Sequence, residues 1–225
     1  MMDWTAVILS VKLALVTQLV LLPPAILCAR WLALTTFRGK VWIEGILALP
    51  LVLPPTVIGY YLLVAMGGNS AMGRWIEALI GQPLAFSFSG LVVASVLVNI
   101  PFAVQPAQRA FEAISLEVHE AAKCCGLTFW QTFHCIELPL AWPGILSAMM
   151  MTFAHTLGEF GVVLMVGGNI PGETQTLAIS IYDRVQSFDF SAAGTMSLLL
   201  LVISLVTIAV SYGMVERLMR HRRSP

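Results

Sequence analysis

The chain has 225 residues, of which 58% are hydrophobic and only 11% are charged, and its formal net charge at pH 7 is +0. A soluble domain of this size usually has about 25% charged residues, so the charges here are too few to cover a water-exposed surface. The composition therefore excludes an ordinary soluble domain, and the balanced net charge gives no indication of a nucleic-acid partner.

Five apolar stretches are long enough to cross a bilayer, because about 20 helical residues span its hydrocarbon core. A backbone surrounded by hydrocarbon must satisfy its own hydrogen bonds, which favours helices. We therefore predict an all-α fold, a polytopic membrane helix bundle with about five transmembrane helices, that forms a single domain over residues 1–225. The predicted spans are Val11–Leu34, Ile46–Ala65, Leu91–Gln108, Trp142–Met165 and Ala193–Val215.

The first of these stretches lies where a secretion signal would lie. It lacks the positively charged start of such a signal, since Asp3 is the only charged residue before Lys12. It also continues to Leu34 without an A-x-A cleavage site, so we expect a retained membrane span.

Prolines interrupt the first three predicted spans, where each removes a backbone hydrogen bond and can kink a helix. Such kinks suit a pore that opens to alternate sides, and they equally suit any packed bundle. In the fourth span, Gly144, Ala148 and Thr152 form a stripe of small residues that predicts close helix packing or pore lining. The prolines are Pro23, Pro24, Pro50, Pro54, Pro55 and Pro101.

The segments that connect the spans differ in their content of Lys and Arg. Nine basic residues lie on one side of the predicted bundle and three on the other. Because basic residues stay in the cytosol, we predict that the N-terminus is outside and the C-terminus is cytosolic. The nine are Arg30, Arg38, Lys40, Arg109, Lys123, Arg217, Arg220, Arg222 and Arg223, and the three are Lys12, Arg74 and Arg184.

The region between the fourth and fifth spans leaves a sixth crossing open as an alternative. It contains Glu173, Asp183, Arg184 and Asp189, and these charges favour an external loop. We expect this loop to include a short helix around Leu177–Phe188.

A cytosolic segment at about 109–141 separates the third and fourth spans. Its apolar positions recur at helical spacing until Gly126 interrupts the pattern. Thr128 and Gln131 then form a capping-box pattern that opens a second short helix. These features predict a helix–glycine–helix unit on the inner membrane face, which could also be an interfacial loop that merely joins two spans.

The same segment resembles the EAA loop of ABC-importer permeases, whose pattern is E-A-A-x3-G-x9-I-x-L-P. The resemblance implies a coupling helix that docks into a cleft of a cytosolic ATPase. Small alanines would allow close packing on that partner, and the glycine permits a sharp turn with positive φ. The matching residues are Glu120, Ala121, Ala122, Gly126, Ile136, Leu138 and Pro139.

Three further stretches are similar to the molybdate subgroup of these permeases: residues 49–60 (LPLVLPPTVIGY), 158–161 (GEFG) and 169–174 (NIPGET). Sulfate permeases share the EFG element and the coupling loop, and tungstate matches molybdate closely in size and charge. The resemblance implies a multi-pass protein of a bacterial or archaeal cytoplasmic membrane. It also implies three kinds of protein partner: a second copy of the chain, a cytosolic ABC ATPase dimer and an extracytoplasmic oxyanion-binding protein.

No G-x-x-x-x-G-K-[ST] phosphate-binding loop occurs in the sequence, and Gly39-Lys40 lacks both the upstream glycine and the following Ser or Thr. We therefore expect a chain that is not an enzyme and binds no cofactor, with ATP used by a partner subunit. The cysteines lack zinc-ligand spacing, so we expect no metal site. All four lie on or near the predicted cytosolic side, so we expect reduced thiols. These are Cys28, Cys124, Cys125 and Cys135, and we expect His119, His134 and His221 to be surface residues.

His155 and Glu159 lie four residues apart in the fourth span and so share one helix face. Ionisable residues inside a membrane are functional candidates, which allows either a proton relay or a local structural pair. We favour the structural pair, because an ATP-driven importer needs no proton coupling, with Glu159 as an outer-gate or loop-anchoring residue. Candidates for the translocation path or its gate are Asn99, Thr152, Gly158, Glu159 and Gly161.

Two other classes of function stay open. An ion-coupled secondary carrier usually shows internal repeats and paired broken helices, and we find no convincing repeat in the sequence. A membrane-embedded enzyme would have to rely on His155 and Glu159.

Overall fold

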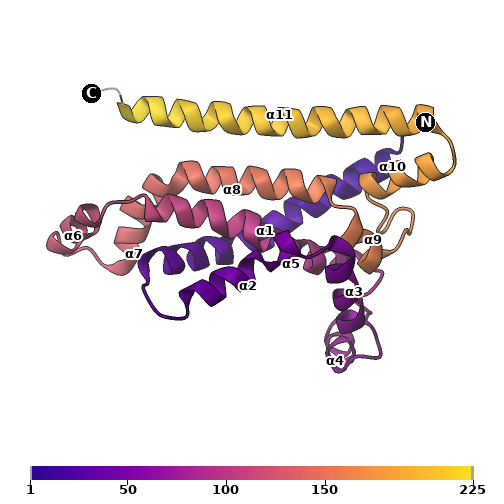
Figure 1. Ribbon diagram of the computed structural model, residues 1–225, viewed down its shortest axis with the longest axis horizontal. Helices are drawn as coiled ribbons and strands as arrows, with labels where there is room; N and C mark the ends of the chain where they lie inside the picture. The colour runs from indigo at the N-terminus through magenta and orange to yellow at the C-terminus, as the bar shows by residue number, and fades with distance from the viewer. Residues whose placement is uncertain (1, 224–225) are drawn as a thin grey trace.

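The computed structural model describes residues 2–223, and over this range the chain forms helices and no strand. Long helices run side by side along the longest axis of the molecule (Figure 1). Four helical stretches in the described range are long and apolar enough to cross a membrane. They are α1 (Trp4–Leu34), α5 (Phe88–Glu112), the stretch Phe129–Gly158 that ends in α8 (Leu138–Gly158), and α11 (Phe190–Arg223).

The second predicted span is a pair of helices bent by 106°, α2 (Lys40–Val52) and α3 (Pro55–Met66). Leu53 and Pro54 separate the two helices in extended conformations. Pro55 then starts α3, where a missing N–H does no harm. Counted as one broken span, this pair brings the total to five, which confirms the predicted all-α membrane bundle.

The fourth span ends earlier than the sequence predicts. Helix α8 stops at Gly158, Glu159 takes an extended conformation, and the separate helix α9 (Gly161–Gly167) follows. The predicted end at Met165 is therefore wrong, because the chain turns at Glu159 so that α9 can pack against α3 and α5. The preceding helical stretch starts at Phe129, inside the segment 109–141 that we predict to be the coupling loop.

The main core lies where α1, α5 and α8 meet, and includes Leu32, Phe111 and Ile145. Helix α8 approaches α5 closely at Gly144, where an added Cβ would lie 2.4 Å from the Cβ of Ala110. Ala148 and Thr152, further along the same stripe, are fully buried. The predicted packing role of the small-residue stripe is thus confirmed.

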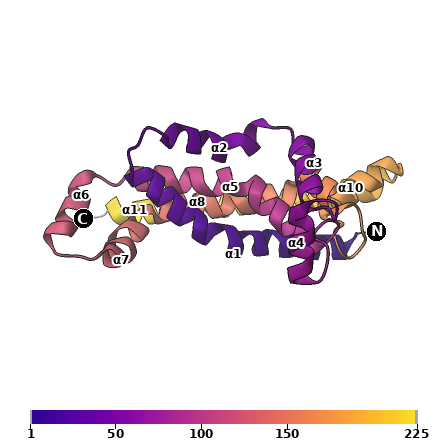
Figure 2. The ribbon, with the colours of Figure 1, turned by 90° about the horizontal axis from the view of Figure 1, so that it is seen from below.

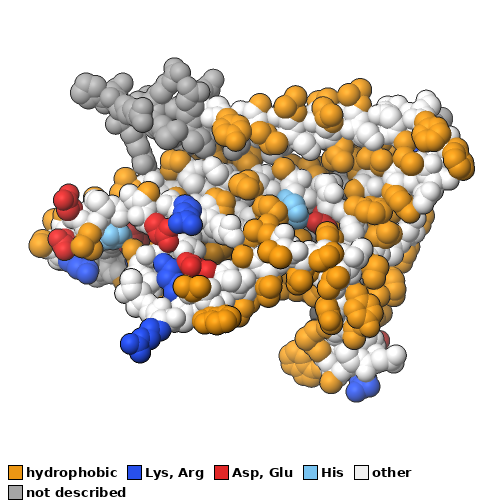
Figure 3. All heavy atoms as spheres, viewed as in Figure 1, with side chains coloured by type: hydrophobic (Ala, Val, Ile, Leu, Met, Phe, Trp, Pro, Cys, Tyr) orange, Lys and Arg blue, Asp and Glu red, His pale blue; other side chains and the backbone are white. Residues whose placement is uncertain are grey.

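The two ends of the bundle carry different elements (Figures 1 and 2). One end holds α6 (Leu116–Cys124), α7 (Phe129–Thr132) and the last turns of α11, and on the face in Figure 3 most charged side chains gather there. The other end holds the N-terminus with α4 (Ala71–Ile80), α9 and α10 (Leu177–Gln186). Helix α10 matches the short helix predicted around Leu177–Phe188.

The orientation of the chain in the membrane stays a prediction. The basic residues at the C-terminal end on which it partly depends have side chains outside the described part of the chain. These residues are Arg217, Arg220, Arg222 and Arg223, and the same holds for His221.

Candidate functional site

The predicted helix–glycine–helix unit is present between α5 and α8. Helix α6 ends at Cys124, and Gly126 follows with a φ of +74°. Its N–H donates to the carbonyl of Lys123 at 2.9 Å, in the left-handed geometry typical of a glycine after a helix. Thr128 and Gln131 then form the predicted capping box at the start of α7.

The motif residues of this unit face in different directions. Glu120 and Ala121 are exposed, whereas Ala122 is only 2% exposed. The prediction that both alanines pack against a partner is therefore wrong for Ala122, because its own chain covers it. The exposed residues of α6 and α7 combine acidic and large apolar side chains, and besides Glu120 they include Leu116, Glu117, Phe129 and Trp130.

Between α7 and α8 the chain forms a π-helical turn, η1 (Phe133–Glu137). Ile136 and Leu138 are partly buried here, and Leu138 packs against the main core. Pro139 is exposed near the start of α8, where a helix does not need its N–H. The second half of the motif thus joins the helix–glycine–helix unit to the bundle, and Leu138 contributes to the core.

A buried charge cluster that we did not predict from the sequence is centred on Glu137, whose side chain is 1% exposed. The guanidinium of Arg30 donates to both carboxylate oxygens, Nε to Oε2 and Nη2 to Oε1 at 2.9 Å. Nδ1 of His119 lies 3.3 Å from Oε1, so the prediction that His119 is a surface residue is wrong. The available signal was a carboxylate at the variable position of I-x-L-P, beside a span where a charge needs a partner.

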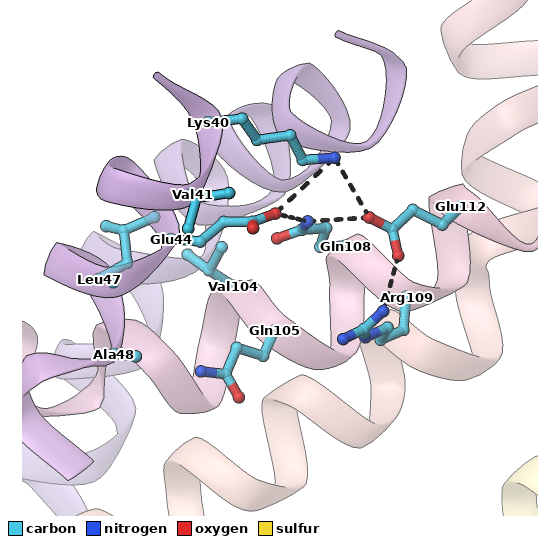
Figure 4. Close-up of a pocket in the computed structure, with 11 residues that line it drawn as sticks. Lys40, Val41, Glu44, Leu47, Ala48, Val104, Gln105, Gln108, Arg109 and Glu112 are labelled. Atoms are coloured by element: carbon cyan, nitrogen blue, oxygen red, sulfur yellow. Dashed lines mark hydrogen bonds and ion pairs between the residues drawn. The ribbon is translucent and has the colours of Figure 1, made fainter. Parts of the chain in front are cut away.

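A second polar cluster lines a pocket of about 610 Å³ between α2 and α5 (Figure 4). Nζ of Lys40 lies 3.7 Å from Glu44 and 3.6 Å from Glu112. Gln108 donates to both carboxylates, and Arg109 pairs with Glu112 at 3.2 Å. Two cations face two carboxylates, so the charges balance and the pocket does not favour binding of an anion. The cluster instead holds α2, the first half of the broken span, against α5.

Three of the polar candidates inside the bundle form one chain of contacts. Asn99 is fully buried, and its Oδ1 lies 3.2 Å from Nδ1 of His155. Nε2 of His155 lies 3.5 Å from Oε2 of Glu159, whose other oxygen accepts the N–H of Val162 at 3.3 Å. The ring of Phe102 stacks on His155 at 4.1 Å. This arrangement links α5, the end of α8 and the first turn of α9.

The remaining path candidates lie outside this chain of contacts. Thr152 is fully buried, and its hydroxyl has no hydrogen-bond partner among the described residues. Gly161 touches α3, since an added Cβ would lie 2.9 Å from Cβ of Pro55. Gly158 has open space around it. A role for any of these residues in a translocation path stays a prediction.

The chain was compared with known proteins. The model of a family described as "Binding-protein-dependent transport system inner membrane component" matches residues 24–224. The molybdenum transport system permease protein ModB of Azotobacter vinelandii is 48% identical over 191 residues, covering 85% of this chain and 84% of that protein. ModB of Haemophilus influenzae is 37% identical over 220 residues, covering 97% of this chain and 96% of that protein.

More distant matches include a sulfate permease and solved transporters. The sulfate transport system permease protein CysT of Escherichia coli is 32% identical, covering 76% of this chain and 61% of that protein. The crystal structure of a bacterial ABC transporter involved in the import of alginate matches with a TM-score of 0.76 at 18% identity. That match covers 95% of this chain and 78% of the solved chain, and it shows the same fold.

Proposed function

Because the chain belongs to the family of binding-protein-dependent transport system inner membrane components, we propose that it is the permease subunit of an ABC importer that translocates molybdate. The observation that carries this proposal is the 48% identity to ModB of Azotobacter vinelandii over most of both chains. The several membrane helices and the family match place the chain in a bacterial inner membrane as a multi-pass protein. Sulfate as cargo is less well supported, since CysT shares 32% identity over a smaller part of each chain.

The energy for transport comes, in this proposal, from a separate ATPase subunit. The exposed surface of α6 and α7 supports this, because Glu120 and Ala121 are exposed on α6, and the chain turns at Gly126 directly after this helix. The carboxylate of Glu120 has no ion pair among the described residues and is free to meet a basic side chain. The other motif residues connect this surface to the bundle and to α8: Ala122, Ile136, Leu138 and Pro139.

The complete importer holds two copies of this chain, an ATPase dimer on the cytosolic side and an oxyanion-binding protein on the other side. Helix α11 supports a membrane or second-copy environment, since Leu198, Leu201 and Leu205 are each about 60% exposed within one chain. The cargo path runs between the copies. Asn99, Thr152, Gly158, Glu159 and Gly161 belong to this path or to its gate, and the chain itself binds no cofactor.

The test is uptake into proteoliposomes that contain the chain, its ATPase and the binding protein. We expect ATP-dependent uptake of molybdate that excess sulfate does not reduce and that survives collapse of ion gradients. Uptake that needs an ion gradient and no ATP would identify a secondary carrier instead. Sulfate uptake would keep the importer and replace its cargo.

A charge reversal separates docking from folding in the same assay. Glu120→Lys should reduce recovery of the ATPase with the permease by at least about tenfold, because the docking surface would carry the wrong charge. The fold should be unaffected, since Glu120 makes no ion pair among the described residues. Gln82→Lys, an exposed position in the loop before α5, is the control and should retain both assembly and uptake.

A further inference from the structure

The charge cluster of Arg30, His119 and Glu137 joins three parts of the chain that are distant in sequence. Arg30 belongs to α1, His119 to the cytosolic helix α6, and Glu137 to the turn η1 that leads into α8. We propose that this cluster is a strut that transfers movement of the docked coupling unit to the first span. The proposal rests on the proposed function, and it assigns a positioning role to three residues outside the E-A-A, glycine and I-x-L-P positions.

The hydrogen bonds of Glu137 support a rigid connection between α1 and η1. The two parallel hydrogen bonds from Arg30 fix both the distance and the angle between α1 and η1. The guanidinium also lies 4.3 Å from the ring centroid of Phe129 and 5.6 Å from that of Phe133. Arg30 therefore contacts both α7 and η1, so these elements cannot turn against α1 without disturbing it.

A cavity separates part of α6 from α1, so the polar contacts of His119 are important for connecting α6 to the bundle. A cavity of about 380 Å³ is lined by Leu34 of α1 and by Leu116 and Lys123 of α6. His119 bridges this loosely packed region, since its Nδ1 reaches the carboxylate that Arg30 holds. Nε2 of His119 is buried without a hydrogen-bond partner among the described residues, so its only polar anchor there is Glu137.

The connection to α8 is of another kind. Helix α7, η1 and α8 follow one another as continuous helix from Phe129 to Gly158, so a push on α7 reaches α8 through the backbone. Helix α1 ends at Leu34, far upstream in sequence, and has no such covalent route. Transfer to α1 therefore depends on contacts across space, and the strut supplies the most directional of them.

The test compares ATP hydrolysis with molybdate uptake in the reconstituted importer. We expect His119→Leu to retain ATPase assembly and hydrolysis within about twofold, while the number of ATP molecules hydrolysed per molybdate rises at least threefold. His119→Gln keeps a side-chain donor for Glu137 and should return this ratio to near the wild-type value. An unchanged ratio in His119→Leu would overturn the proposal, because a strut without its α6 contact must transmit less.

Two further variants extend the test to the buried pair. Arg30→Gln combined with Glu137→Gln leaves no unpaired buried charge, and we expect a complex whose ATP per molybdate rises at least tenfold. A wild-type ratio in this double variant would also overturn the proposal. Arg184→Gln, which removes the exposed ion pair to Asp189, is the matched control and should change neither rate. Absence of uptake in the wild-type complex would instead reject the proposed function.

Discussion

At the end of α8, each carboxylate oxygen of Glu159 has a polar neighbour. One oxygen accepts the N–H of Val162 in the first turn of α9, and the other lies 3.5 Å from Nε2 of His155. The side chain is almost fully buried. A carboxylate at the N-terminus of a helix also stabilises the exposed N–H groups there. These contacts explain Glu159 as an anchor between two helices without any transfer of protons.

Two substitutions of Glu159 distinguish a role in anchoring α9 from a role that needs the negative charge. We expect Glu159→Ala to lower the free energy of unfolding by about 1–3 kcal/mol, because the N–H of Val162 and the ring of His155 lose a buried partner. Glu159→Gln keeps an acceptor oxygen and should recover most of that loss, with molybdate uptake within about threefold of wild type. Thermal unfolding of the purified protein and uptake in proteoliposomes measure the two quantities.

The opposite result for Glu159 is just as informative. A glutamine variant with wild-type stability but with uptake reduced by about a hundredfold would contradict the anchoring role, and it would assign a function to the charge. Asn99→Ala provides a comparison, because it removes the contact to the other ring nitrogen of His155 and leaves Glu159 intact.

At the scale of elements, the broken span is held by close contacts between α3 and α9. An added Cβ at Gly59 would lie 2.7 Å from Cβ of Met165 and 3.3 Å from Cα of Val162. From the other side, Gly161 lies equally close to Pro55, the first residue of α3. Glycine on both helices allows the backbones to approach, as in other membrane helix pairs. The bend in the second span and the end of α8 at Gly158 thus allow α3 and α9 to pack closely.

This contact gives a prediction with a matched control. We expect Gly59→Ala to lower the free energy of unfolding by about 1–3 kcal/mol, because the methyl group overlaps Met165 in a packed interface. Gly45→Ala places the same methyl group in a helix with nothing within 4 Å, and alanine favours helices over glycine. The control should therefore be neutral or stabilising in thermal unfolding. Equal effects of the two substitutions would contradict the proposed packing.

Some elements of the fold can be predicted from their local sequence, whereas others depend on contacts with distant parts of the chain. The capping box at Thr128 and the positive φ of Gly126 arise from neighbouring residues, so the helix–glycine–helix unit could be predicted in detail. Hydropathy gives the number of spans, and the prolines indicate a kink in the second span. Neither gives the angle of 106° between α2 and α3, because α3 packs against α9, which lies far along the chain. The partner of Glu137 lies 107 residues away, and nothing in the local sequence indicates it.

The whole molecule has two ends of different character, and this bears on its orientation. Lys40, Arg30 and Lys123 all belong to the end that carries α6 and α7, either in ion pairs or beside the cavity there. Basic residues concentrate on the cytosolic side of membrane proteins. In the proposed importer an ATPase docks on α6, and an ATPase can reach only surfaces that face the cytosol. We therefore predict that α6 lies in the cytosol and that α4 and α10 lie outside.

Native cysteines allow this orientation to be measured without changing the coupling unit. Cys124, Cys125 and Cys135 are exposed, and all lie in or beside α6 and η1. In cells that produce the permease without its ATPase, we expect a membrane-impermeant maleimide to label these thiols in inside-out vesicles. Spheroplasts should show at least about tenfold less labelling, because the reagent cannot cross the membrane.

A thiol on the other side completes the measurement. Gln82→Cys, in a variant whose native cysteines are replaced by serine, lies in the exposed loop between α4 and α5. We expect this thiol to react in spheroplasts and to be protected in inside-out vesicles. The reverse pattern for both sets of thiols would place the coupling unit outside the cell, where no ATPase could dock, and the proposed mechanism would fail with the orientation.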